Sequence, residues 1–297
     1  MKSVLRFCAA VVLAGLASGV LVLAQVQLPA EPPKQFGSGV TGAFEGWFDN
    51  ADGSHNFLVG YLNRNRAQAV DIPIGPNNRI EPVGPDMGQP THFLPGRQIG
   101  MFMVTVPKEF TPQQRLTWTL TYNGQTNQIP LRLHTDYNVS PLKIEHGGAF
   151  SDTPPVLRFE ERGTAIQGPV AMTSKLAFTK TTSVSTPLVL DFWAEDDAKF
   201  SSGTNAPMRK PPPPVNMTFS KYRGPGNVTF DKVKPTLETL KGGNVGQLYL
   251  GKGTTTAKFS EAGEYLLHVT VNDYTGDGGG GEVCCWTTAI MKVTVTP

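Results

Sequence analysis

The sequence predicts an all-β fold, and three observations support this prediction. Gly and Pro are abundant, at 32 and 25 of the 297 residues, and only 17% of the residues are charged. Several short segments alternate apolar with polar residues, which is the period of a strand with one buried face. Long stretches with the period of an amphipathic helix are missing. We therefore expect two β-sandwich domains that follow an N-terminal signal peptide.

The first 24 residues have the composition of a secretion signal. Lys2 and Arg6 precede an apolar run of small residues that ends at Ala24, where the sequence suits a signal peptidase. Cleavage there would leave a mature chain that begins near Gln25. The alternative is an uncleaved anchor, because the run is close to the ~18 residues of a plausible transmembrane helix. We expect a secreted or periplasmic protein, with no membrane span once the signal is cleaved.

Loss of this signal also changes the charge of the chain. The full sequence has 26 Lys and Arg against 24 Asp and Glu, and the signal contains two of the basic residues and no acid. The mature chain is therefore formally neutral. Because nucleic-acid binding requires a concentration of positive charge, nucleic acid is excluded as an expected partner.

The clearest strand signal lies in residues 115–134. Apolar residues occupy every second position from Leu116 to Tyr122 and again from Ile129 to Leu133. Between them lies Asn123-Gly124, a pair well suited to the positive φ angles of a tight hairpin turn. The segment predicts a β-hairpin with Trp118 on its buried face.

Short strands separated by turns rich in Pro and Gly surround this hairpin, at the spacing typical of a β-sandwich. In the second half of the chain, Leu188, Leu190 and Phe192 begin a new alternating series. The predicted organisation is a signal peptide (1–24), a Pro-rich tether (25–39), a β-sandwich domain (40–142), a connector that could contain strands (143–186) and a second β-sandwich domain (187–297).

Residues 259–276 carry a resemblance to a known group of modules. Gly263 suits a turn, and Tyr265, Leu267 and Val269 alternate on one face before an Asp-containing loop and a last strand. This segment resembles the final strand pair of PKD, cadherin-like and other immunoglobulin-like modules of exported bacterial proteins. The resemblance implies an immunoglobulin-like sandwich. His268 has the opposite parity to these core residues, so we expect it to face solvent.

Acidic residues of the second domain could hold a cation. Glu195, Asp196 and Asp197 follow one predicted strand, and Asp273 and Asp277 follow another, so they could meet at one end of the sandwich. Ca²⁺ prefers such oxygen ligands, and the cadherin-like modules use acidic loops in this way. The alternative is a set of solvated acidic loops. Calcium is the only cofactor that the sequence suggests.

Cys284 and Cys285 are the cysteines that remain after signal cleavage, and they follow a Gly-rich run. Three alternatives are open. The pair could have a local structural role, with one thiol on each face of a strand or with a vicinal disulfide. It could form an intermolecular bridge, or it could take part in redox or metal chemistry.

Trp193 has the opposite parity to Leu190 and Phe192, which indicates an outward-facing aromatic platform of the kind that binds carbohydrate. The five histidines are scattered along the chain, and neither a His-Glu-x-x-His nor a Gly-x-Ser-x-Gly motif occurs. These observations favour binding over catalysis.

The expected function is therefore that of an exported non-catalytic protein for binding, adhesion or an accessory role, with a protein or carbohydrate partner. It would act through the loops and edges of its sandwiches. Two alternatives remain: a secreted hydrolase of polysaccharide or peptide, and a structural subunit of a cell-envelope assembly.

Overall fold

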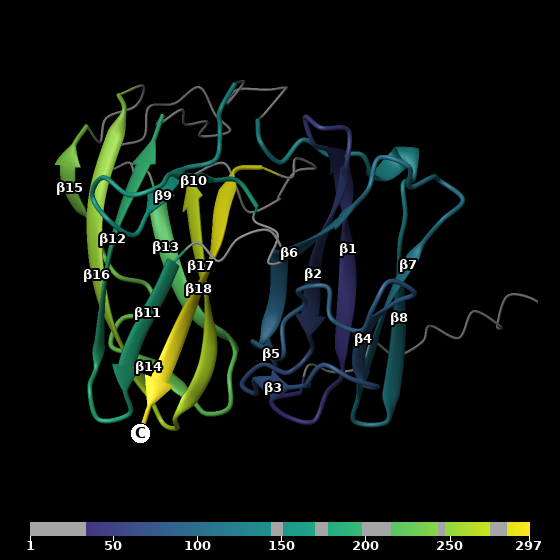
Figure 1. The fold of residues 1–297 in the computed structure, drawn as a ribbon, viewed down its shortest axis with the longest axis horizontal. Helices are drawn as coiled ribbons and strands as arrows, with labels where there is room; N and C mark the ends of the chain where they lie inside the picture. Colours follow the sequence, from purple (N-terminus) through teal and green to yellow (C-terminus); the bar gives the residue numbers. More distant parts are fainter. Residues whose placement is uncertain (1–33, 144–150, 170–177, 198–214, 243–246, 274–283) are drawn as a thin grey trace, which may run out of the picture. The chain divides into compact units, whose positions relative to one another are not determined.

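A computed structural model describes residues 34–143, 151–169, 178–197, 215–242, 247–273 and 284–297, and these form an all-β protein of packed sandwiches (Figure 1). The predicted signal peptide and most of the predicted tether lie outside the described residues. In the part that is described, no helix reaches the length and apolar character that a bilayer span requires. The predicted fold class is confirmed.

The first sandwich consists of two three-stranded sheets, with strand orders β1-β2-β6 and β4-β7-β8, and a small sheet, β3-β5. Residues 34–39 attach to it, since the Ser38 N–H donates to Asn65 Oδ1 at 2.6 Å. Its elements are β1 (Val40–Asp49), β2 (His55–Asn63), β3 (Val70–Asp71), β4 (Asn78–Glu81), β5 (His92–Phe93), β6 (Gly96–Val106), β7 (Leu116–Tyr122), β8 (Gln125–Leu131) and a 3₁₀ helix, η1 (Thr135–Tyr137).

The second sandwich packs the sheet β10-β9-β12-β16-β14, which β15 joins through β16, against the sheet β11-β18-β17-β13. Within the latter sheet, β11 runs parallel to β18 while the other pairs are antiparallel. Its strands are β9 (Val156–Arg158), β10 (Ile166–Gln167), β11 (Phe178–Ser183), β12 (Leu188–Asp196), β13 (Val215–Arg223), β14 (Val228–Phe230), β15 (Glu238–Lys241), β16 (Tyr249–Phe259), β17 (Gly263–Asp273) and β18 (Trp286–Thr296).

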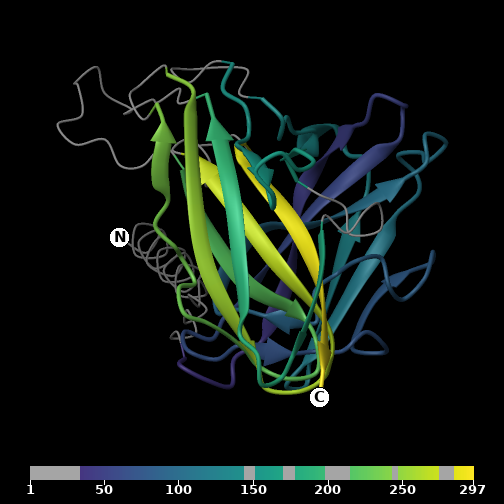
Figure 2. The same ribbon diagram turned by 60° about the vertical axis from the view of Figure 1, so that its left-hand side comes forward.

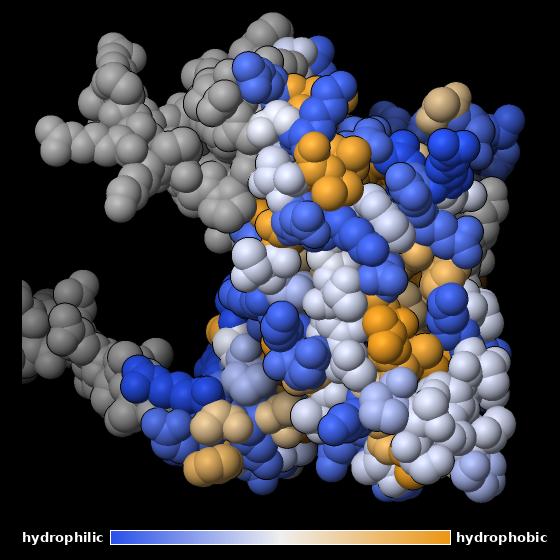
Figure 3. Space-filling model, turned by 90° about the vertical axis from the view of Figure 1, so that its left-hand side faces the viewer, coloured by the Kyte–Doolittle hydropathy of each residue, from blue (hydrophilic) through white to orange (hydrophobic). Residues whose placement is uncertain are grey.

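The two sheets of the second sandwich have different surroundings. The sheet with β12 and β16 lies on the side away from the first sandwich, as Figures 1 and 2 both show. On its outer face, polar side chains predominate and apolar ones form small patches (Figure 3). The sheet with β17 and β18 lies between the two cores (Figure 2). Within the described part of the chain, only the first of these sheets therefore presents a full face to solvent.

The hairpin that the alternation predicts is formed by β7 and β8. The register runs from Leu116 opposite Leu131 to Tyr122 opposite Gln125. Asn123 has φ 51° and Gly124 has φ 74°, the left-handed values that a two-residue hairpin turn needs. Turn chemistry and alternation together set this register.

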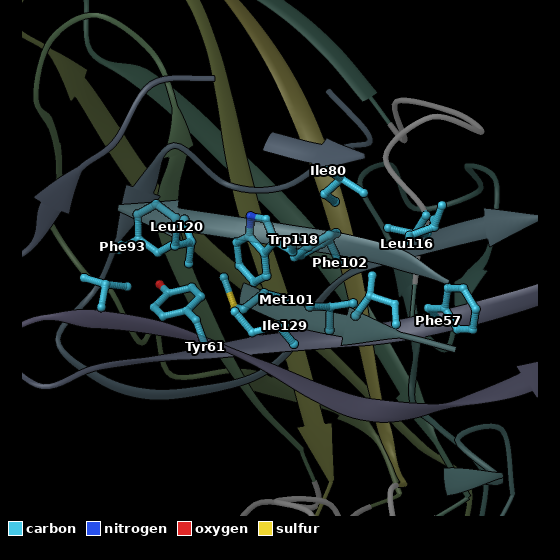
Figure 4. Packing of buried hydrophobic residues seen from close by; sticks show 14 of the residues in the cluster. Phe57, Tyr61, Ile80, Phe93, Met101, Phe102, Leu116, Trp118, Leu120 and Ile129 are labelled. Carbon is cyan, nitrogen blue, oxygen red and sulfur yellow. The ribbon is translucent and has the colours of Figure 1, made fainter. Parts of the chain in front are cut away.

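Trp118 of β7 is fully buried at the centre of the first core (Figure 4). Its ring meets Phe102 edge-on, with 5.2 Å between the ring centroids. The indole Nε1 donates to Asn78 Oδ1 at 3.0 Å, and Asn78 Nδ2 donates to the backbone carbonyls of Ile72 and Pro90 at 2.9 and 2.8 Å. Asn78 thus satisfies three buried polar groups, which links the ring to two loops.

Apolar side chains join the two sandwiches. On one face of the sheet β11-β18-β17-β13, residues such as Val269 and Val293 fill the second core. On the opposite face, Tyr222 and Ile290 belong to the core of the first sandwich, and Trp286 packs in a cluster with residues of β1, β2 and β6. The two sandwiches therefore share buried surface.

Directional contacts at the end of β13 reinforce this junction. Arg223 donates from Nη1 and Nη2 to the two carboxylate oxygens of Asp86, at 2.9 and 2.8 Å. This hydrogen-bonded guanidinium is the main reason why the pKa of Asp86 is lowered. Tyr222 Oη donates to the Gly88 carbonyl at 2.5 Å, and the Thr91 N–H donates to the Tyr222 carbonyl at 3.2 Å. Bidentate pairing fixes orientation as well as distance.

Replacing Asn78 by alanine is expected to lower the free energy of unfolding by roughly 3 kcal/mol, because three polar groups in a dry core lose their hydrogen bonds. Urea denaturation followed by tryptophan fluorescence measures this change. The exposed neighbour Asn77 provides the matched control, and Asn77→Ala should change the same free energy by less than ~0.5 kcal/mol. Equal effects of the two substitutions would contradict the role given to Asn78.

Candidate functional site

Trp193 lies half-buried on the outer face of β12, opposite in parity to the buried Phe192. Across the strand pair, Lys252 Nζ lies 5.0 Å from the centroid of the indole ring. Asp191 accepts a hydrogen bond from Thr254 Oγ1 at 2.6 Å, and its carboxylate is 3.8 Å from Lys252 Nζ. These contacts place the Lys252 cation over the indole ring.

A groove of about 260 Å³ opens beside this ring, and two further aromatic residues line it. Phe159 and Phe178 are stacked, with 5.4 Å between the ring centroids and 14° between the ring planes. Lys180 Nζ lies 4.7 Å from the centroid of Phe178. The groove therefore combines flat apolar surfaces with a cation at its edge.

Carboxylates complete the rim of this groove. Glu160, Glu161 and Asp191 all line it, and all three residues are exposed. Carboxylate oxygens accept strong hydrogen bonds from hydroxyl groups. The combination of aromatic faces with several carboxylates can thus bind a ligand that has both an apolar face and hydroxyl groups.

Phe159 and Phe178 are site residues that the sequence analysis missed. They come from the predicted connector, whose described part contributes β9 beside β12 and β11 beside β18. The available signal was the two apolar runs that end at Phe159 and Phe178, but nothing in those runs shows which strands they pair with. The parity of Trp193, by contrast, could be taken directly from its own strand.

The predicted calcium ligands lie in different environments. Glu195 is ion-paired with Arg158, while Asp196 and Asp273 are buried at the ends of β12 and β17. Asp197 is partly buried just after β12, and Asp277 lies outside the described residues. The structure therefore leaves the calcium hypothesis as a prediction.

Asp273 belongs to a cluster that the sequence did not indicate. Within the described ranges, ligand atoms of Asp152, Asp273 and Cys285 all lie within 4.8 Å of one another, and the three residues are buried. Asp152 belongs to the predicted connector, so its position next to Asp273 depends on tertiary packing. No pattern of spacing in the sequence could have connected the two.

Cys284 and Cys285 form a disulfide with each other, and both residues are fully buried. Cys285 Sγ lies 3.6 Å from the backbone carbonyl oxygen of Asp152. A bonded sulfur cannot act as a thiolate, so in this state the cluster offers its two carboxylates but no thiolate ligand. Of the three alternatives for these cysteines, this arrangement corresponds to the local structural role.

A second hollow, of about 500 Å³, lies where the two sandwiches meet, and we call it the cleft. Thr218, Ser220 and Thr270 line it from β13 and β17, and Trp286 lines it from β18. Gly100 of β6 has φ +55°, and a Cβ atom there would lie 2.4 Å from Trp286 Cζ2. Glycine at this position therefore lets the indole approach the first sandwich closely.

His268 also lines the cleft, and its predicted exposure to solvent is wrong. It faces away from its own core, as the alternation requires, but the first sandwich covers that face and the residue is 2% exposed. Its ring stacks on Tyr222 with 5.6 Å between the centroids. Burial lowers the pKa of His268 to about 4, although the Met101 backbone acts in the opposite direction. The ring is therefore uncharged at neutral pH.

Fold and hollows together define a double β-sandwich protein. No protein-family model and no curated protein matches the chain. One similar solved structure is the D00-D0 domain of Intimin, at 10% identity and TM-score 0.24, over 87% of this chain and 100% of that one. Another is domains 4 and 5 of the S-layer protein SbsC, at 12% identity and TM-score 0.19, over 62% and 66% of the two chains.

A third similar structure is a family 123 glycoside hydrolase from Clostridium perfringens, at 11% identity and TM-score 0.22. The match covers 40% of this chain and only 22% of that enzyme. With similarities this low, the three structures carry no argument about function.

The disulfide predicts a specific alkylation result. Iodoacetamide should add nothing to a chain of residues 25–297 unfolded without reductant, and two carbamidomethyl groups after reduction, because Cys284 and Cys285 are the two cysteines of that stretch. Intact mass spectrometry measures both states. A disulfide-linked dimer in the unreduced sample would instead support the intermolecular bridge.

The buried imidazole predicts how stability depends on pH. The unfolded chain protonates His268 near pH 6.5, whereas the folded chain does so only near pH 4. The free energy of unfolding should therefore decrease as the pH is lowered from about 6.5 to about 4. This residue contributes up to about 3 kcal/mol to that decrease. His268→Gln should remove this part of the decrease in the free energy of unfolding, as measured by urea denaturation at several pH values. His134→Gln, at a more exposed position, should leave the decrease in place. Equal slopes in the His268 variant and the wild type would contradict this assignment.

Proposed function

We propose that this chain is an exported non-catalytic protein that binds carbohydrate in the groove beside Trp193, for an adhesive or accessory role. The observation that carries the proposal is the indole of Trp193, which lies under Lys252 beside a groove with three exposed carboxylates on its rim. A tryptophan has only two side-chain torsions, so such a platform loses little conformational entropy when a ligand binds.

Carbohydrate is the ligand class that suits this chemistry. The C–H face of a sugar ring can pack on an indole, while its hydroxyl groups donate to carboxylates such as Glu160 and Glu161. At about 260 Å³ the groove is smaller than the roughly 300–1,000 Å³ of typical small-molecule pockets. It would therefore hold one unit of a longer chain that continues over the polar outer face of the sheet.

Two features support the exported location. The first 24 residues have the charge and hydropathy of a signal peptide. Disulfides such as that between Cys284 and Cys285 persist in oxidising compartments and are rare in the cytosol. A carbohydrate-binding surface is useful in the same places, since extracellular and envelope polymers are rich in sugars.

Trp193→Ala is expected to weaken binding to the preferred glycan about tenfold or more, because the aromatic platform is lost. A glycan array of the mature protein identifies the ligand, and calorimetric titration measures the change in Kd. Trp193→Phe should retain part of the affinity. Leu240→Ala is the matched control, since Leu240 is an exposed apolar residue of the same sheet that does not line the groove.

Two results would contradict the proposal. If no glycan binds, or if Trp193→Ala and Leu240→Ala have the same effect, the groove is not a carbohydrate site. If the mature protein shortens the glycan that it binds, the hydrolase alternative replaces the non-catalytic one.

A further inference from the structure

The cleft between the sandwiches has features that carbohydrate binding at Trp193 does not use. In the register of β13 with β17, Thr218 lies opposite Thr270 and Ser220 lies opposite His268. Toward either end of this row, Trp286 and Tyr222 make the apolar contacts with the first sandwich. The middle of the shared face is therefore polar and borders a hollow of about 500 Å³, which is within the roughly 300–1,000 Å³ of small-molecule sites.

Two buried nitrogen atoms belong to the side chains that line this cleft. His268 Nε2 and Trp286 Nε1 have no hydrogen-bond partner among the residues described, and the two residues are 2% and 3% exposed. The Met101 backbone interacts with the His268 ring without completing a hydrogen bond to Nε2. Buried polar groups nearly always form hydrogen bonds in folded proteins. An acceptor supplied by a ligand would therefore remove the free-energy cost of leaving these groups unbonded.

In one tautomer of His268, both atoms are donors. The indole Nε1 can only donate. Thr270 Oγ1 lies 3.3 Å from His268 Nδ1, and when this hydroxyl donates, the proton of the neutral imidazole sits on Nε2. In that tautomer two buried N–H groups of residues that line the cleft lack an acceptor, which favours a ligand rich in acceptor oxygens.

The charged residues of the cleft also favour a ligand with anionic oxygens. Arg97 and Lys234 line it, and no carboxylate does so in the described ranges. The positive charge of Arg97 is balanced by Glu45, because Arg97 Nη2 donates to both carboxylate oxygens of Glu45 at 2.7 Å. Lys234 is exposed and has no ion pair with any described residue. Among the residues that the structure describes, the cleft therefore carries one uncompensated positive charge.

An apolar wall completes the site. Leu94, Ile99 and Met101 contribute it from the first sandwich, opposite the hydroxyl groups of β13 and β17. A ligand that fits must have an apolar body as well as anionic oxygens. We propose that the cleft binds a small organic anion, a carboxylate attached to a compact apolar body.

The test uses the mature chain and three probes that share one apolar body: 3-phenylpropionate, 3-phenylpropionamide and 3-phenylpropylamine. Two-dimensional NMR titration gives the Kd of each. The acid should bind with a low-millimolar or lower Kd, as expected for about eleven non-hydrogen atoms. It should bind about threefold to fivefold more tightly than the amide, and the amine should bind most weakly.

Lys234→Ala should weaken binding of the acid about threefold to fivefold and leave the amide unchanged. Lys232→Ala is the matched control, because Lys232 is an exposed lysine of the same segment that does not line the cleft. Thr270→Val, which keeps the shape of the side chain but removes the hydroxyl group that contacts His268, should also weaken binding of the acid.

The proposal is overturned if the acid fails to bind up to about 10 mM. It is also overturned if the three probes bind equally, or if the Lys234 and Lys232 variants behave alike. Trp193→Ala should leave binding of the acid intact, and Lys234→Ala should leave glycan binding intact. Failure of one site is thereby distinguished from failure of the other.

Discussion

The attachment of β13 to the first sandwich is the constraint on which the rest of the structure depends. Tyr222 and Arg223 bind the segment between β4 and β5 through the Gly88 carbonyl and the Asp86 carboxylate. Apolar side chains such as Ile290 contribute the buried surface of this junction, and the bidentate pair adds a directional contact to it. That fixed placement covers His268 and at the same time leaves the cleft open.

Local signals account for the parts of the fold that the sequence could predict. The hairpin of β7 and β8 joins neighbouring strands, so alternation and the Asn123-Gly124 turn are sufficient to define it. The same reasoning places Trp118 in the core and Trp193 on the outer face. In each case the information lies within about ten residues of the side chain concerned, in the period and the turn residues of one strand or strand pair.

What the sequence could not predict depends on pairings between distant segments. β11 pairs in parallel with β18, and β9 pairs with β12, so Phe178 and Phe159 reach the groove from a stretch interpreted as a connector. A parallel pair needs a long crossover, which alternation does not reveal. His268 is a further example of information that the sequence lacks. Alternation along β17 predicts on which face of the sheet it lies, but not that the first sandwich covers that face.

The position of β18 bears on the order in which the molecule can assemble. This strand follows every other strand that the structure describes, yet its Ile290 belongs to the core of the first sandwich. Domains tend to fold as they emerge, with the N-terminal one first. The first sandwich would thus emerge from the ribosome with part of an apolar flank uncovered until residues 286–296 follow. That interval is a defined window in which a chaperone could bind the nascent chain.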